Sequence, residues 1–193
     1  DYVNPVSDAI CDIIVDLLNR VCTHLPKILR YFSSDVEDDV VTLILRGVAA
    51  AMQLDVSAAS DAKLTDMIRR WNDTGMRTGS GRTPLHIASS LELMNYRVLT
   101  CIKFVHTLIE AGADINARDR EGNTALHWAV KAATSGNNGK LLDASAIVGL
   151  LVRGGAHVDI TNNKGWAVTD KFVSVRTPLD LRCLAARVIR DNE

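Results

Sequence analysis

The chain has 193 residues, of which 47% are apolar and only 5% aromatic, and its formal net charge is −1. This length is sufficient for one substantial core or for an elongated array of helices. The near-neutral charge gives no support for nucleic acid or a membrane surface as a partner. Residues 1–80 carry 12 acidic and 8 basic side chains and residues 81–193 carry 11 and 14, so the two halves differ only mildly in charge.

The four cysteines, Cys11, Cys22, Cys101 and Cys183, form neither a Cys-x-x-Cys pair nor a zinc-binding spacing. Free thiols in a reducing compartment are therefore expected, which favours a cytoplasmic location with the nucleus as the alternative. The sequence contains no signal peptide and no apolar run of membrane length. Because it begins with Asp1 rather than Met, we expect a fragment of a longer intracellular protein.

The N-terminal part has the periodicity of amphipathic helices. Residues 6–22 place apolar side chains at three- and four-residue steps, which predicts a helix. Pro26 should end or kink this helix near His24 and leave residues 27–32 as a shorter helical piece. The side chains expected on its inward face are Ile10, Ile13, Ile14, Leu17, Leu18, Val21 and Cys22.

Two more helices are predicted before residue 80. The spacing of Ser34 and Glu37 is that of a capping box, and it introduces a helix to Met52 that is apolar almost all round and should be central to this half. A third helix should run from Ala62 to Trp71. We expect residues 1–80 to form a helical region of three amphipathic helices and a linker, either as a cap on the C-terminal half of the chain or as part of a longer repeat array.

One eight-residue pattern occurs twice, 41 residues apart, at residues 81–88 (Gly-Arg-Thr-Pro-Leu-His-Ile-Ala) and 122–129 (Gly-Asn-Thr-Ala-Leu-His-Trp-Ala). Its threonines, Thr83 and Thr124, are suited to cap a helix that begins with the next residue. Each pattern is followed by a helix pair and a Gly-Ala loop. One such unit cannot bury its own apolar face, so neighbouring units must stack.

This arrangement resembles the ankyrin repeat, a β-turn followed by two antiparallel helices. The resemblance implies that His86 and His127 hold the backbone of adjoining loops by hydrogen bonds, as structural residues together with Thr83 and Thr124. The predicted fold is all-α: a helical N-terminal segment, two insertion-bearing ankyrin repeats, a degenerate half-repeat and a C-terminal helix. The corresponding ranges are 1–80, 81–121, 122–164, 165–172 and 173–193.

Each repeat is longer than the usual length of about 33 residues. The spacing is 41 residues from Gly81 to Gly122 and 43 residues from Gly122 to Gly165. The insertions are expected between the helices of each pair, around residues 91–96 and 133–142. Insertions on one side of a repeat stack often belong to its binding side.

Side chains that could carry catalysis have simpler interpretations here. His86 and His127 could form a metal pair or a general base, but the structural role is favoured. Cys183 has no histidine near it in the sequence. The carboxylates of the repeat loops, at Asp114, Asp119 and Asp159, are most simply turn-formers or solvated rim residues. We therefore expect no enzyme, no cofactor and no metal.

The C-terminal segment predicts a helix that begins after Thr177 and Pro178. Leu179, followed four residues later by Cys183 and then Leu184, resembles the box of von Hippel-Lindau-type proteins, an apolar helix that inserts into elongin C. The position where the box has a final aliphatic residue is Arg187, with Ala186 one residue earlier.

The long repeats, residues 155–162 and residues 181–187 together resemble the C-terminal region of the Fem (feminisation) family of ankyrin proteins. Members of that family are substrate receptors of cullin-RING ubiquitin ligases: an N-terminal ankyrin block reads degrons, and a C-terminal box recruits elongins B and C and the cullin. The resemblance implies that the box residues meet elongin C, with the arginines at the rim of its pocket. These residues are Leu179, Arg182, Cys183, Leu184 and Arg187.

The first hypothesis is therefore a non-catalytic adaptor that binds elongin B/C, and a cullin where the contact segment is present, while its ankyrin and helical surface binds protein substrates or regulators. The alternative is a generic ankyrin interaction module in which residues 177–190 only cap the stack. An enzymatic function would need a pocket that unites His127 with a carboxylate or with Cys101.

Overall fold

The computed structural model describes residues 5–29, 34–52, 58–73, 75–90, 98–134 and 141–169. These residues form helices joined by turns and loops, and their one β-type pairing is an isolated antiparallel bridge between Thr161 and Ala167. The predicted all-α class is confirmed. The helices are α1 (Pro5–Leu29), α2 (Ser34–Ala51), α3 (Ala58–Asp73), α4 (Pro84–Ser89), α5 (Val98–Glu110), α6 (Ala125–Thr134) and α7 (Leu141–Arg153).

Helix α1 is longer than predicted, because it continues through Pro26 to Leu29. Of the two predicted outcomes, an end near His24 is therefore wrong, and a kink there stays a prediction. Proline removes one backbone hydrogen bond to the preceding turn, but Pro26 lies in the last turn of α1, and the rest of the helix is held by packing on α2 and α3. Most of the stability of a helix in a protein comes from such packing rather than from its own backbone bonds.

The inward face of α1 also differs from the prediction. Cys11, Val15 and Leu18 are buried in the core. Ile10, Ile13 and Leu17, which were expected inside, are exposed by 42%, 68% and 59%. The apolar sector of α1 is wider than the surface that α2 and α3 cover. Its outer half forms an exposed row, called the α1 stripe below, made of Val6, Ile10, Ile13 and Leu17.

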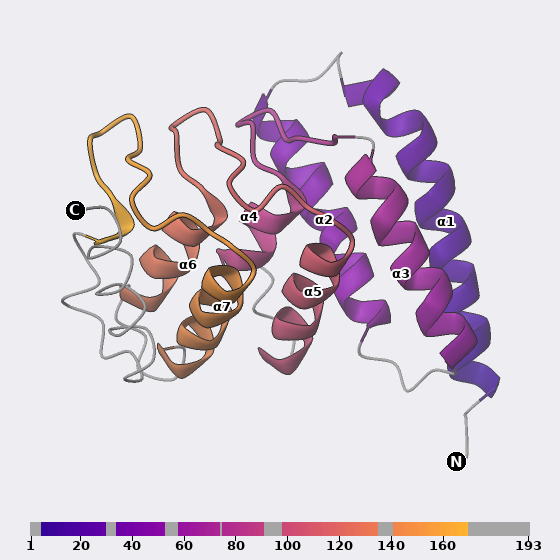
Figure 1. The fold of residues 1–193 in the computed structure, drawn as a ribbon. Coiled ribbons are helices and arrows are strands. Elements are labelled where there is room, and N and C mark those ends of the chain that lie inside the picture. Colours follow the sequence, from indigo (N-terminus) through magenta and orange to yellow (C-terminus); the bar gives the residue numbers. More distant parts are fainter. Residues whose placement is uncertain are drawn as a thin grey trace.

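Helix α2 is central, as its composition predicted. It contacts α1 on one side and α4 and α5 on the other, so it joins the N-terminal helices to the rest of the array. Val41, Leu45 and Val48 are buried along it, whereas Leu43 is two-thirds exposed. Figure 1 shows α1 and α3 at one end of the molecule and α6 and α7 toward the other.

The second half is a stack of two helix pairs. Helix α4 packs on α5 and α6 packs on α7, while α4 also contacts α6 and α5 contacts α7. The core of the stack is apolar and includes Phe104, Leu85, Leu108, Leu126, Ile147 and Leu151. The loops that connect successive pairs lie along one edge of the molecule (Figure 1). The extra residues of each repeat lie mainly between its two helices, in ranges 91–97 and 135–140, which are outside the described residues.

The second helix of each pair is followed, two residues after its end, by a glycine in the left-handed region. Gly112 has φ +80° and Gly155 has φ +96°. After α5, the Ala113 N–H donates to the Leu108 carbonyl (3.0 Å) and the Gly112 N–H to the Ile109 carbonyl (3.0 Å). This pair of bonds is the Schellman motif, and it turns the chain into the loop that leads to the next repeat.

The C-terminal part of the chain is described only as far as Thr169. The start of the predicted half-repeat at Gly165 is therefore visible, and the predicted box helix at residues 173–193 lies outside the described residues. Within the described ranges, no helix is both long enough and apolar enough to cross a membrane.

Candidate functional site

The first motif histidine connects its own helix to the next loop. Thr83 precedes α4 with an extended backbone (φ −87°, ψ 166°). Its N–H donates to His86 Nδ1 (3.0 Å), and its hydroxyl lies 2.7 Å from the same nitrogen. His86 Nε2 lies 3.0 Å from the Asn123 carbonyl oxygen. Because a carbonyl can only accept, Nε2 carries the proton and Nδ1 is the acceptor.

The second motif histidine repeats this geometry. The Thr124 N–H donates to His127 Nδ1 (3.1 Å), and its hydroxyl lies 2.8 Å away. His127 Nε2 donates to the Trp166 carbonyl (3.2 Å), and the two rings meet edge to face with centroids 4.9 Å apart. Each histidine thus ties one repeat loop to the next. Both ring nitrogens are occupied within the fold, which leaves neither ring a free nitrogen for a metal.

Burial keeps both rings neutral. His86 is fully buried, and desolvation lowers its pKa to about 4, against the smaller opposing effect of the Asn123 carbonyl. Desolvation likewise lowers the pKa of His127. A neutral imidazole can accept and donate one hydrogen bond each, which is the pattern that both motif histidines use.

A buried carboxylate organises the loop between α5 and α6. Asp119 Oδ1 accepts the N–H groups of Glu121 (2.9 Å) and Asn123 (2.8 Å), so this residue is a turn-former as expected. Its other oxygen, Oδ2, accepts the indole N–H of Trp128 (2.9 Å). Asp119 is only 8% exposed, so it is not the solvated rim residue that the sequence left as an alternative.

The other two loop carboxylates fit the simpler interpretation. Asp114 is exposed, and its Oδ1 accepts the Asn116 N–H (3.1 Å), which makes it a turn-former. Asp159 is exposed, and its Oδ1 lies 3.8 Å from His157 Nδ1. Neither carboxylate faces a buried histidine.

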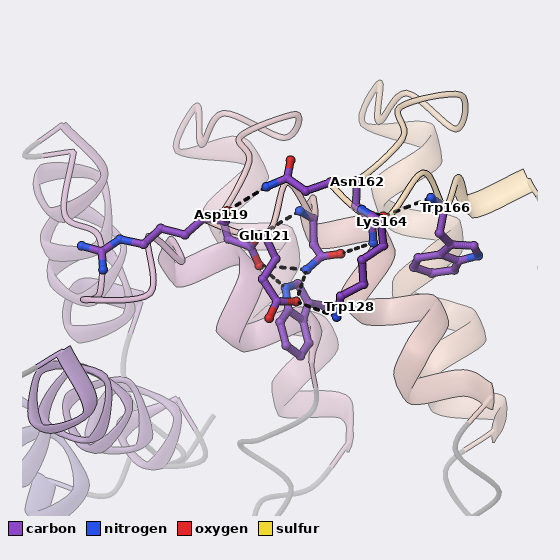
Figure 2. Close-up of polar contacts among 9 residues, drawn as sticks. Asp119, Glu121, Trp128, Asn162, Lys164 and Trp166 are labelled. Atoms are coloured by element: carbon purple, nitrogen blue, oxygen red, sulfur yellow. Dashed lines mark hydrogen bonds and ion pairs between the residues drawn. The ribbon is translucent and has the colours of Figure 1, made fainter.

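Two asparagines extend the Asp119 network to the next loop. Asn162 Nδ2 donates to Asn123 Oδ1 (2.8 Å), and Asn162 Oδ1 accepts the N–H groups of Lys164 and Trp166 at 3.0 Å each. Figure 2 shows the network running from Asp119 and Trp128 to Asn162 and Trp166. These side chains are satisfied by one another, so they hold the two loops at a fixed distance.

Three residues that take part in this network, Asn123, Trp128 and Asn162, line a cleft of about 250 Å³. Helix α6 provides one wall, with Trp128 and Lys131, and the two loops provide the other. The lining residues are Glu121, Asn123, His127, Trp128, Lys131, Asn162, Lys164 and Trp166. We call this feature the loop cleft.

Cations lie close to the aromatic part of the loop cleft. The Arg82 guanidinium lies 4.2 Å from the centroid of the Trp128 ring, and Lys131 Nζ lies 4.4 Å from it. Lys164 Nζ is 3.8 Å from Glu121 Oε2, and both side chains are more than 60% exposed. An ion pair this long and this exposed contributes little to stability.

The loop cleft is built for binding rather than proton transfer. It contains both His127 and a carboxylate, Glu121, which is the combination that an enzymatic function would require. However, His127 has both nitrogens in structural hydrogen bonds and a lowered pKa. Cys101 is buried on α5 and is not among the lining residues. The described parts of the chain contain no cluster of three or more His, Cys, Asp or Glu residues suited to a metal ion.

The residues predicted to contact a partner, Leu179, Arg182, Cys183, Leu184 and Arg187, lie outside the described residues. Sequence reasoning missed Trp128, Asn162 and Trp166 as parts of a site. For Trp166 a signal was present, because Gly165-Trp166 occupies the same place in its repeat as Gly122-Asn123. The Asn123 carbonyl accepts a hydrogen bond from the motif histidine of the preceding repeat, and the Trp166 carbonyl does the same. Nothing in the sequence indicated the pairing of Asn162 with Asn123.

The sequence matches known proteins over this same region and beyond it. The family description "Ankyrin repeats (many copies)" matches residues 93–142. Fem-1 homolog C of Xenopus laevis is 34% identical over 195 aligned residues, covering 90% of this chain and 30% of that protein. Fem-1 homolog A of Rattus norvegicus is 33% identical over 131 residues (61% and 18%). The fem-1 homolog CG6966 of Drosophila melanogaster is 28% identical over 190 residues (89% and 26%).

The stacked helix pairs, the histidine bonds between loops and the family match define an ankyrin-repeat protein. The chain spans less than a third of the length of the curated relatives it matches. With these similarities to vertebrate and insect proteins, it belongs to the Fem family of ankyrin-repeat proteins.

Proposed function

We propose that this chain is a non-catalytic adaptor, the part of a substrate receptor that attaches it to elongin B/C within a cullin-RING ubiquitin ligase. The observation that carries the proposal is the Leu179-x-x-x-Cys183-Leu184 pattern directly after an ankyrin stack, in a chain related to fem-1 proteins. The stack itself supports the broader part of the proposal, a scaffold for protein-protein interaction.

The mechanism is recognition of a helix in a groove, with no bond chemistry. Leu179, Cys183 and Leu184 would enter an apolar pocket of elongin C, and Arg182 and Arg187 would lie at its rim. The cullin would join through the same end of the chain. This mechanism places the adaptor in the cytoplasm or nucleus, and the ankyrin and helical surfaces remain for substrates or regulators.

Capture of purified elongin B/C by the immobilised chain tests the proposal. Changing Leu179 and Cys183 together to glutamate should abolish capture, because buried apolar anchors carry most of the energy of such an interface, about 2 kcal/mol or more each. Arg190→Glu, in the same segment but outside the box positions, should leave capture nearly unchanged. Equal capture by the Leu179/Cys183 variant and the unmodified chain would remove the elongin proposal.

The second candidate is an ankyrin module in which residues 177–190 serve only as a cap. The ankyrin stack supports this candidate too, because the repeats form an interaction scaffold whatever residues 177–190 do. Under this alternative, the Leu179/Cys183 variant should lower the free energy of unfolding by about 2 kcal/mol or more. Under the adaptor proposal it should lose elongin and unfold at nearly the same urea concentration as the unmodified chain.

A further inference from the structure

Two asparagines that line the loop cleft are held in place by hydrogen bonds. Asn123 is bonded to Asn162 and, through its N–H, to the buried Asp119, and Asn162 accepts the Trp166 N–H, so these side chains do not need to rearrange when a ligand arrives. A preorganised surface loses less conformational entropy on binding than a mobile one. The bonded asparagines therefore fix the distance between the two loops that carry Glu121 and Lys164.

The size of the loop cleft favours a protein segment over a small molecule. Its volume, about 250 Å³, is below the range of about 300–1,000 Å³ typical of small-molecule pockets. It lies between the loop edge and α6, and its walls come from two successive repeats. A peptide could place one or two side chains in the cleft and continue across the adjoining loops.

The charges around the cleft are mainly positive. Lys131 and Lys164 are the cationic residues of its lining, and the Arg82 guanidinium lies over Trp128. The acidic residues nearby are already engaged, because Asp119 is buried in its network and Glu121 faces both Lys164 and the Asn123 amide (3.3 Å). A carboxylate from a ligand would replace a weak, exposed ion pair at Lys164 and would add a partner beside Lys131.

We propose that the loop cleft binds an extended acidic segment of a partner protein, with carboxylates at Lys131 and Lys164 and an apolar side chain against Trp166. The inference rests on the proposed adaptor function, for which it names the class of partner that the ankyrin surface takes. Trp and Arg are the residue types most enriched where binding energy concentrates.

Fluorescence anisotropy on the full chain tests the proposal with a defined probe. The probe is a labelled peptide, Gly-Asp-Leu-Asp-Glu-Leu-Asp-Gly, and its matched control has Asn and Gln in place of the acids. The acidic peptide should bind, and its affinity should fall several-fold when the ionic strength rises from about 20 mM to about 200 mM. The amide peptide should bind at least tenfold more weakly.

Charge reversal localises the binding. Lys131→Glu combined with Lys164→Glu should weaken the binding of the acidic peptide at least tenfold. Arg69→Glu, an equal change of charge at an exposed position on α3, should leave its affinity unchanged. Circular dichroism should show the same helix content in all three proteins, because all three positions are exposed.

Three outcomes overturn the proposal: no binding of the acidic peptide up to about 1 mM, equal binding of the amide peptide, or an unchanged affinity after reversal of both lysines. The elongin capture experiment separates this failure from that of the adaptor function. The Lys131/Lys164 variant should still capture elongin B/C, and the Leu179/Cys183 variant should still bind the acidic peptide.

Discussion

His86 shows how one side chain can serve three structural purposes in this fold. It accepts from Thr83 at the start of α4, donates to the Asn123 carbonyl in the next loop, and fills a fully buried position between them. All three depend on the neutral ring. A protonated ring would have no acceptor for the Thr83 N–H and would place a charge in a desolvated site.

Acid should therefore destabilise the protein through His86. Its pKa is about 4 in the folded chain, against 6.5 as the ordinary value. The lowered folded pKa means that its contribution to stability is complete above pH 6.5 and is lost as the pH falls from 6.5 to about 4. The loss corresponds to about 3 kcal/mol. The lowered pKa of His127 acts in the same direction.

Urea unfolding of His86→Gln from pH 7 to pH 4 measures this effect. At pH 7 the variant should be less stable than the unmodified chain, because it loses the imidazole contacts. The difference in free energy of unfolding between the two proteins should be smaller by about 3 kcal/mol at pH 4, since glutamine does not titrate. His106→Gln, at an exposed position on α5, is the matched control and should follow the unmodified chain. A difference in free energy of unfolding that stays constant with pH would contradict the lowered pKa of the buried His86.

At the scale of the element, helix positions were easier to predict than the faces that the helices bury. The Thr-Pro-Leu-His pattern located the start of α4, and Ser34 located the start of α2, because caps and first-turn prolines act locally. The wide apolar sector of α1 did not indicate which half would be covered. That choice depends on where α2 and α3 pack, which periodicity alone does not encode.

The α1 stripe provides the test at this scale. Ile13→Gln and Leu17→Gln should each change the free energy of unfolding by no more than about 0.5 kcal/mol, because both side chains are mostly exposed. Leu18→Ala, on the buried side of the same helix, should cost about 2–5 kcal/mol. Urea denaturation measures all three. If Ile13→Gln costs as much as Leu18→Ala, the stripe is covered in solution.

At the scale of the whole molecule, the repeats were predictable because each motif acts within its own unit and on its neighbour. The register of Gly81, Gly122 and Gly165 predicted the stacking of neighbouring units. The loop cleft was not predictable from the same register. It depends on side-chain pairs that the repeat pattern does not encode, above all Trp128 with Asp119 within one repeat and Asn162 with Asn123 between neighbouring loops.

The number of neighbours on which each helix packs also predicts which part of the molecule opens first. Among the helices that the structure describes, α1 packs extensively on α2 and α3 alone, whereas α4 and α5 have neighbours on both sides. In an array of this kind, stability is the sum of local terms and nearest-neighbour interfaces, and elements with fewer packed contacts open at lower free energy. Amide hydrogens of α1 should therefore exchange with solvent faster than those of α4 and α5.

Two core variants test that description by native-state hydrogen exchange. Leu18→Ala should raise exchange mainly in α1, α2 and α3, and Leu126→Ala, which empties a fully buried position on α6, should raise it mainly in α6 and its neighbours. The free energy of opening should fall by about 2–5 kcal/mol in the affected helices and by less in the others. Uniform loss of protection across all helices in both variants would mean that the chain opens as a single unit, and that the N-terminal helices and the repeats share one cooperative core.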